Sequence, residues 1–255
     1  MGVLNVTPDS FSDGGCFLDP AAALEQASRM IAEGADILDI GAESTRPYGG
    51  AVAVPSDEEI RRLAPVLPAA VALGVPVSLD TMKATVAEWA LAAGAAIVND
   101  VWGLQRESAL AQVVVERGVP VIIMHNRDAA DAAIDILADI SAFFSRSLEI
   151  ARRAGIAREK IVLDPGIGFG KTTEQSLTAI ARVGEFKSFG LPLLVGASRK
   201  RFIDKVSPAP PDQRLGGSIA AHVLAILGGA AIIRTHDVAE TVQALRVAAA
   251  IRSAR

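Results

Sequence analysis

The sequence predicts a (β/α)₈ barrel, and two observations support this prediction. Short apolar runs alternate with helical stretches along the whole chain, and most of these runs are hydrophobic on both strand faces, as in buried strands. Such strands, separated by helices, form parallel sheets with right-handed crossovers. Eight of these units in 255 residues are typical of a barrel that forms one domain over residues 1–255. The alternative, an open doubly wound sheet, more usually has fewer strands.

The elements can be placed along the chain from their hydrophobic spacing. Strands are expected at 1–6, 36–40, 77–80, 97–100, 119–124, 161–164, 193–195 and 231–234. Helices are expected at 20–33, 56–73, 83–93, 108–117, 136–154, 174–189, 215–227 and 238–253, the second of them capped by Ser56. Several helices are followed by a glycine just before the next strand, a position where glycine takes the left-handed conformation that ends a helix.

The composition excludes several classes of partner. The net charge is −4 and the pI is near 5.5, so no nucleic acid or acidic membrane surface is expected to bind. Cys16 is the only cysteine, which rules out an internal disulfide and a cysteine zinc site. No apolar run reaches the roughly 18 residues of a membrane span, and no basic segment leads an apolar one, so we expect a cytoplasmic protein.

Polar residues fall at the ends of the expected strands. In a barrel these ends meet at one mouth, where the active site lies. A single strand ending in Asp is weak evidence of function, because Asp often caps the following helix. Capping does not explain a polar group at every one of the eight strand ends, and these groups are Asn5, Glu43, Arg46, Asp80, Asn99, Asp100, His125, Asp164, Ser198, Arg199, Lys200, Arg234 and His236.

The chemistry of these side chains divides in two. Asp80, Asn99 and Asp164 offer carboxylate and amide oxygens, which suit a flat heterocycle with several N–H donors. A second set offers cationic and imidazole donors for phosphate or pyrophosphate, namely Arg46, Lys200, Arg234 and His236. Asn5 offers a neutral oxygen ligand for a Mg²⁺ ion that keeps most of its waters and bridges phosphates.

The glycine-rich stretch 164–172 is similar to a phosphate loop but does not match one. Pro165 stands where the first glycine of that motif is required. It also fails the dinucleotide-binding pattern, since Lys171 stands where the third glycine should be. His222 lies within an apolar helix, where a packed side chain is the expected interpretation.

Eight motifs together resemble the dihydropteroate synthase family. They are NVTPDSFSDGG (5–15), ESTRP (43–47), DTMK (80–83), VND (98–100), MH (124–125), DPGIGFGK (164–171), SRK (198–200) and RTHDV (234–238). The resemblance covers essentially the whole chain. It implies the condensation of 6-hydroxymethyl-7,8-dihydropterin pyrophosphate with 4-aminobenzoate to 7,8-dihydropteroate and pyrophosphate in folate biosynthesis, a transferase reaction that sulfonamides inhibit in this family.

The resemblance also implies a role for each site residue. Pterin binding falls to Asp80, Asn99, Val101, Met124, Asp164, Phe169, Gly196, Lys200 and Arg234. The aminobenzoate pocket would contain Phe11, Thr45, Pro47 and Ser198, and pyrophosphate would be bound by Asn5, Thr45, Arg46, Arg234 and His236. Catalysis would fall to Arg46, Lys200, Arg234 and His236, with Asn5 as the Mg²⁺ ligand. The loops at 6–19 and 41–55 are expected to be mobile and to close over the mouth, and a homodimer is expected.

Two other functions share this barrel. The pterin-binding domain of corrinoid-dependent methyltransferases keeps the pterin carboxylates but does not need the phosphate-binding cations. A non-catalytic relative would have lost some of the motifs, and none is missing here. The sequence departs from the family pattern at Tyr48 and at Asn126 and Arg127, and none of these departures removes an expected ligand.

Overall fold

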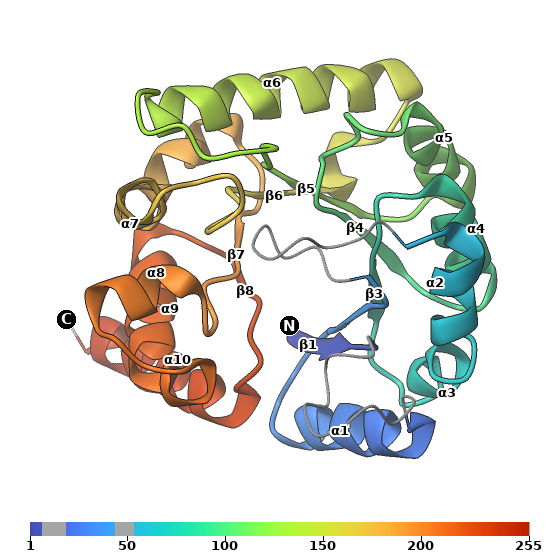
Figure 1. The fold of residues 1–255 in the computed structure, drawn as a ribbon, viewed down its shortest axis with the longest axis horizontal. Coiled ribbons are helices and arrows are strands. Elements are labelled where there is room, and N and C mark those ends of the chain that lie inside the picture. Colours follow the sequence, from blue (N-terminus) through green and yellow to red (C-terminus); the bar gives the residue numbers. More distant parts are fainter. Residues whose placement is uncertain (7–18, 44–53, 255) are drawn as a thin grey trace.

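The chain folds into a ring of parallel strands surrounded by helices (Figure 1). The computed structural model describes residues 1–6, 19–43 and 54–254. The described strands are β1 (Gly2–Asn5), β2 (Leu38–Gly41), β3 (Val77–Asp80), β4 (Ile97–Asp100), β5 (Val121–Met124), β6 (Ile161–Asp164), β7 (Leu194–Val195) and β8 (Ile232–Ile233). Strands β1 to β6 form one parallel sheet in chain order, and β7 pairs with β8.

Isolated bridges join the two sheets into a closed barrel. Leu163 on β6 pairs with Leu193, and its N–H donates to Pro192 O over 2.9 Å. On the other side Gly2 pairs with Thr235, and Val3 N–H donates to Thr235 O over 2.9 Å. The expected (β/α)₈ barrel is therefore confirmed, and the open sheet is not observed.

Helices cover the outside of the ring (Figure 1). Their bounds are α1 (Pro20–Ala32), α2 (Ser56–Leu63), α3 (Leu67–Val71), α4 (Ala84–Ala92), α5 (Ser108–Arg117), α6 (Ile136–Ala154), α7 (Thr173–Ala181), α8 (Arg201–Val206), α9 (Leu215–Gly228) and α10 (Val238–Ser253). Within the described residues, short 3₁₀ helices lie at Arg158–Lys160, Val183–Phe189 and Pro211–Gln213. Helix α5 ends as its glycine predicts, with Gly118 in the left-handed conformation at φ 62°.

Two expected helices are interrupted, and one helix was not expected. The helix expected at 56–73 is two helices, because Pro65 lacks the N–H that would continue α2. Ser56 is the first residue of α2 and not its cap, which is Pro55. The helix expected at 174–189 changes to a 3₁₀ helix at Val183, and α8 follows β7 in a stretch for which no helix was predicted. The mobility expected for loops 6–19 and 41–55 falls almost wholly on residues outside the described ones.

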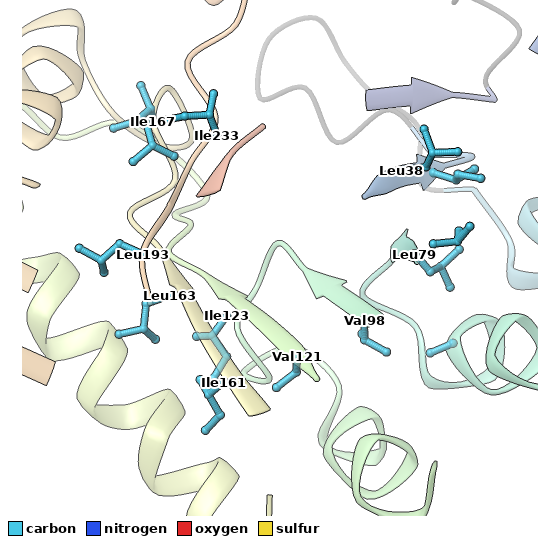
Figure 2. Packing of buried hydrophobic residues seen from close by; sticks show 14 of the residues in the cluster. Leu38, Leu79, Val98, Val121, Ile123, Ile161, Leu163, Ile167, Leu193 and Ile233 are labelled. Atoms are coloured by element: carbon cyan, nitrogen blue, oxygen red, sulfur yellow. The ribbon is translucent and has the colours of Figure 1, made fainter. Parts of the chain in front are cut away.

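Alternate strand residues face opposite sides of the ring. Figure 2 shows Leu38, Leu79, Val98, Val121 and Ile161, which come from β2, β3, β4, β5 and β6 and belong to the buried hydrophobic cluster. The cluster also contains helix residues, so these side chains pack between the strands and the helices. The residues between them in sequence must then face the interior of the ring, since successive strand side chains point to opposite faces.

No helix in the described parts of the chain is long and apolar enough to cross a membrane.

Candidate active site

The strand register places the polar residues at one end of the ring. Asp80 on β3 is the register partner of Asn99 on β4, and Met124 on β5 is the partner of Asp164 on β6. All four side chains are buried and lie at the carboxyl ends of their strands. This is the end at which barrels of this class carry their active sites.

Arg234 joins three strands across the interior of the ring. It follows β8, and its Nε donates to Asp39 Oδ2 on β2 over 2.6 Å. Its Nη2 donates to Asp80 Oδ2 on β3 over 2.9 Å. Asn99 Nδ2 also donates to Asp39 Oδ2, over 3.2 Å, so Asp39 orients both the guanidinium and the amide. Burial alone would lower the pKa of Arg234, but the charges of Asp39 and Asp80 raise it, which keeps the side chain cationic.

Asp80 has one oxygen left for a ligand. Arg234 binds its Oδ2, while its Oδ1 is buried and makes no hydrogen bond to any described residue. A buried acceptor without a donor is costly, so this atom indicates a ligand N–H. Burial raises the pKa of Asp80 to about 7. The charge of Arg234 opposes this rise, and the charges of Asp39 and other carboxylates add to it.

Asp164 and Lys200 face each other across the same mouth. Asp164 Oδ1 accepts from Gly166 N–H over 2.7 Å, and its pKa is raised by burial against the opposing charge of Lys200. Burial lowers the pKa of Lys200 to about 8, although the charge of Asp164 opposes this. Lys200 Nζ donates to Ile167 O and lies 4.6 Å from the centre of the Phe169 ring, a cation–π contact. A cation, a carboxylate and an aromatic face are thus close together.

Ser198 and His236 lie together after β7 and β8. His236 N–H donates to Ser198 Oγ over 3.2 Å, and His236 Nδ1 lies 3.0 Å from the same oxygen. The family resemblance implies that Ser198 belongs to the aminobenzoate pocket and His236 to the pyrophosphate site. Their contact means that these two expected subsites adjoin.

Asn5 ends β1 at the same level, where its register partner is Gly41. Its side chain makes no hydrogen bond to another described residue and is partly exposed. Within the described residues no group of three or more His, Cys, Asp or Glu could bind a metal ion. An amide oxygen alone suits Mg²⁺ that takes its other ligands from water and phosphate.

The remaining predicted residues divide by whether the structure describes them. Val101 and Met124 are buried beside Asp100 and Asp164, and a Cβ added at Gly196 would make ordinary van der Waals contact with Arg234, 3.6 Å from its Cβ. Four predicted residues lie outside the described residues, namely Phe11, Thr45, Arg46 and Pro47.

Asp39 is the site residue that the sequence reasoning missed. It lies in the middle of a strand and not at its end, so the strand-end criterion did not select it. A usable signal existed, because Asp39 is a lone carboxylate between Leu38 and Ile40 in a fully buried strand. A charge in that position needs a buried partner, and Arg234 is that partner.

A separate pocket of about 460 Å³ lies between the loops after β4 and β5 and helix α6. It is lined by residues that include Trp102, Arg106, Asn126, Arg127 and Phe143, and by none of the predicted site residues. Asn126 and Arg127, which depart from the family pattern, therefore border this separate pocket and not the candidate active site.

Comparison with known proteins identifies the family. The model of a family described as pterin binding enzyme matches residues 1–236. The dihydropteroate synthase of Bacillus subtilis is 46% identical over 239 residues, which are 93% of this chain and 83% of that protein.

Solved structures agree in fold over nearly the full length. The dihydropteroate synthase of Clostridium difficile, solved in the presence of pteroic acid, has a TM-score of 0.93 at 49% identity, covering 98% of this chain and 95% of that one. The Xanthomonas albilineans enzyme with 4-aminobenzoic acid has a TM-score of 0.93 at 44% identity, covering 98% and 92%. The chain described here belongs to the dihydropteroate synthase family of pterin-binding enzymes.

Proposed function

We propose that this protein condenses 6-hydroxymethyl-7,8-dihydropterin pyrophosphate with 4-aminobenzoate, giving 7,8-dihydropteroate and pyrophosphate. The observation that carries this proposal is the free Oδ1 of Asp80, which lies at the same mouth as the cations Arg234 and Lys200. One side of the mouth suits the N–H groups of a pterin, and the other suits the charge of a departing pyrophosphate.

The pterin would bind among the buried oxygens. Asp80 Oδ1 and the second oxygen of Asp164 accept no hydrogen bond from a described residue. Asn99 donates its N–H to Asp39, which leaves Oδ1 of Asn99 as an acceptor. A pterin presents a ring amide and an exocyclic amine, and carboxylates accept such paired donors well. Val101, Met124 and Phe169 would flank the ring, and Gly196 would contact it from the end of β7.

The pyrophosphate would be bound by cations. The described candidates are Arg234, Lys200 and His236. Arg46, which lies outside the described residues, is a further candidate. Asn5 would be the protein ligand of Mg²⁺. Asn5 fits this role because its side chain makes no bond to another described residue and a neutral oxygen leaves room for water and phosphate ligands. When bound, Mg²⁺ supplies charge stabilisation to the phosphate oxygens.

The reaction follows from this distribution of charge. The C–O bond between the pterin methylene and the pyrophosphate breaks, and the electron pair leaves with the pyrophosphate. The pterin ring stabilises the resulting cation, and the lone pair of the aminobenzoate nitrogen forms the new C–N bond while that nitrogen loses a proton to solvent. No covalent nucleophile is required, so the side chains act mainly through fixed electrostatics. Ser198 would contribute to the aminobenzoate pocket with Phe11, Thr45 and Pro47.

The methyltransferase alternative is less well supported. A methyl-transferring pterin domain needs the carboxylates but not cations for pyrophosphate. Here two carboxylates hold the partly buried Arg234 at the mouth, His236 follows the same strand β8, and Lys200 follows the neighbouring strand β7.

We also propose a homodimer formed through α9 and α10. These two helices pack on each other and carry large apolar side chains that are more than half exposed, namely Leu224, Leu227, Val247 and Ile251. Apolar groups gathered on neighbouring helices favour contact with a second protein surface.

The formation of 7,8-dihydropteroate from the two substrates with Mg²⁺ tests the proposed function. Product is expected only when both substrates are present, and a sulfonamide, as an aminobenzoate analogue, should compete with aminobenzoate and not with the pterin. A protein that binds pterin but forms no dihydropteroate would favour the binding-only alternatives.

A further inference from the structure

Lys171 is an almost fully buried lysine directly behind the pterin side of the mouth. It lies near the end of the glycine-rich stretch 164–172 after β6, and its exposed fraction is 3%. The stretch is not a phosphate loop, since Pro165 replaces the required glycine. The proposed reaction gives this lysine no task. Burial of an ammonium group is costly and needs full compensation.

Three acceptors surround the lysine nitrogen. Lys171 Nζ lies 2.6 Å from His125 Nδ1, 2.8 Å from Gly166 O and 3.1 Å from Phe169 O. Burial holds the pKa of Lys171 well below its usual value, although the charge of Asp164 opposes this. Its ammonium form has three N–H donors, one for each of the three acceptors around the nitrogen. Two of the partners are carbonyls of the same short turn, and the third is a side chain at the end of β5.

Asp139 determines which nitrogen of His125 carries the proton. Its Oδ2 lies 3.0 Å from His125 Nε2 and accepts from Arg127 Nη1 over 2.9 Å. The pKa of Asp139 is lowered, because its bonds to Arg127 and His125 outweigh its desolvation, so it is a carboxylate. His125 Nε2 must therefore carry a proton. Burial, with the charge of Lys171, lowers the pKa of His125 to about 3, so the ring is neutral and Nδ1 accepts from the lysine.

The turn that Lys171 binds is tightly packed against β5. Gly166 has φ +63°, and a Cβ there would lie 1.9 Å from His125 O. A Cβ at Gly170 would lie 2.4 Å from Arg127 Cβ. The backbone of the turn 166–170 therefore packs closely against residues 125–127. Lys171 donates directly to two carbonyls of that turn, Gly166 O and Phe169 O, and its third partner is His125 Nδ1.

The same turn presents the pterin-binding groups. Gly166 N–H binds Asp164 Oδ1, Ile167 O accepts from Lys200, and the Phe169 ring lies against Lys200. A shift in the turn would thus move a carboxylate, an aromatic ring and a cation together.

We propose that Lys171 is a positioning residue for the pterin. Oriented by His125 and Asp139, it binds Gly166 O and Phe169 O and thereby fixes the turn 165–170 that directs Asp164, Phe169 and Lys200 toward the ring. Lys171 itself does not touch the substrate. The inference rests on the proposed function only in taking the ligand of this mouth to be a pterin.

The test compares Lys171→Met with Gln175→Met. Both changes replace a buried polar side chain with one of similar length. Gln175 is one helical turn further along and binds Asp131 O over 2.7 Å and Thr172 N–H over 2.9 Å, but no atom of the turn. The dissociation constant of 6-hydroxymethylpterin is measured by calorimetry, together with the thermal midpoint of each variant.

We expect Lys171→Met to weaken pterin binding at least tenfold and to raise the KM for the pterin pyrophosphate, with the KM for aminobenzoate changed less than twofold. Gln175→Met should lower the thermal midpoint but change the dissociation constant of 6-hydroxymethylpterin by less than twofold. Unchanged pterin binding in Lys171→Met, or an equal loss in both variants, would overturn the inference.

A second pair of variants covers the case in which Lys171→Met does not fold. His125→Asn keeps an acceptor oxygen near the position of Nδ1, whereas His125→Leu removes it. The asparagine variant should bind pterin within threefold of the wild type, and the leucine variant at least tenfold more weakly. Equal binding by the two would contradict the role. The chain has only three histidines, so ¹⁵N-histidine spectra can also confirm a neutral His125 with its proton on Nε2.

Pterin binding does not depend on turnover, which separates this inference from the proposed function. A wild-type protein that binds pterin without forming dihydropteroate would refute the reaction and leave the Lys171 comparison valid. Normal turnover with unchanged pterin binding in Lys171→Met would refute the positioning role alone.

Discussion

Arg234 and Asp39 are 195 residues apart in the chain, yet the Nε of the arginine lies 2.6 Å from Oδ2 of the aspartate. The contact crosses the interior of the barrel, from the end of β8 to the middle of β2. Because Asp39 is fully buried, it acts on Arg234 without screening by solvent. It holds the guanidinium where Nη2 reaches Asp80, so a residue below the mouth sets the geometry within it.

Neutralising Asp39 should therefore impair both stability and catalysis. Asp39→Asn leaves the partly buried guanidinium with Asp80 as its one direct carboxylate partner among the described residues. Breaking a fully buried pair typically costs about 3–5 kcal/mol, which is an upper limit here. We expect lower stability in denaturant melts and a lower kcat/KM for the pterin pyrophosphate. Asp36→Asn, on the exposed residue just before the same strand, is the matched control. Equal behaviour of the two variants would contradict the role assigned to Asp39.

The pH dependence of catalysis should have two limbs. Asp80 must be ionised to accept pterin N–H groups, and its pKa is raised to about 7 by burial, so kcat/KM should fall as the pH drops below about 7. Lys200 must be protonated, and burial lowers its pKa to about 8, so kcat/KM should fall above about 8. The optimum is then expected between these values.

The acid limb can be assigned by mutation. Asp80→Asn cannot ionise, so its remaining activity should be lower and should fall less steeply than that of the wild type between pH 8 and pH 6, where only Asp164 among the pterin carboxylates remains to titrate. A wild-type kcat/KM that is flat from pH 6 to pH 9 would show that neither group titrates during pterin binding.

Asp164 should contribute strongly to pterin affinity. Asp164→Asn replaces an acceptor with an N–H₂ group and leaves the ring donors badly paired, which should weaken pterin binding by about 2–5 kcal/mol. Calorimetric titration with 6-hydroxymethylpterin measures this loss. An unchanged dissociation constant would remove Asp164 from the pterin site.

The proposed dimer predicts a change in size on mutation. Leu224→Asp and Ile251→Asp place a charge on side chains that are 59% and 64% exposed, and a buried unpaired charge opposes association. Sedimentation velocity should then show a monomer. Leu177→Asp, on α7 at 40% exposure, is the control and should leave the wild-type size. A dimer that persists in both α9 and α10 variants would place the interface elsewhere.

The parts of the fold that the sequence predicted best are those with a local signal. Strands 77–80, 97–100 and 161–164 were placed to the residue, because each apolar run ends in an aspartate. Pro65 also indicated the break between α2 and α3, but the helical spacing of apolar residues continues across it, and one long helix was predicted instead. The polar strand ends were recognised for the same local reason, as the placement of Asp80, Asn99 and Asp164 at one mouth shows.

The parts that could not be predicted depend on contacts between distant segments. Asp39 becomes a site residue only through Arg234, and Lys171 becomes intelligible only beside His125, 46 residues earlier. Spacing along the chain contains no information about such pairs, since they arise when the ring closes.

The most direct test of the whole account is pyrophosphate release. The protein is mixed with Mg²⁺, 6-hydroxymethyl-7,8-dihydropterin pyrophosphate and 4-aminobenzoate, and each substrate is omitted in turn. Sustained release is expected only when both substrates are present, with one dihydropteroate formed per pyrophosphate. Release at the same rate without aminobenzoate, or none with both substrates, would contradict it.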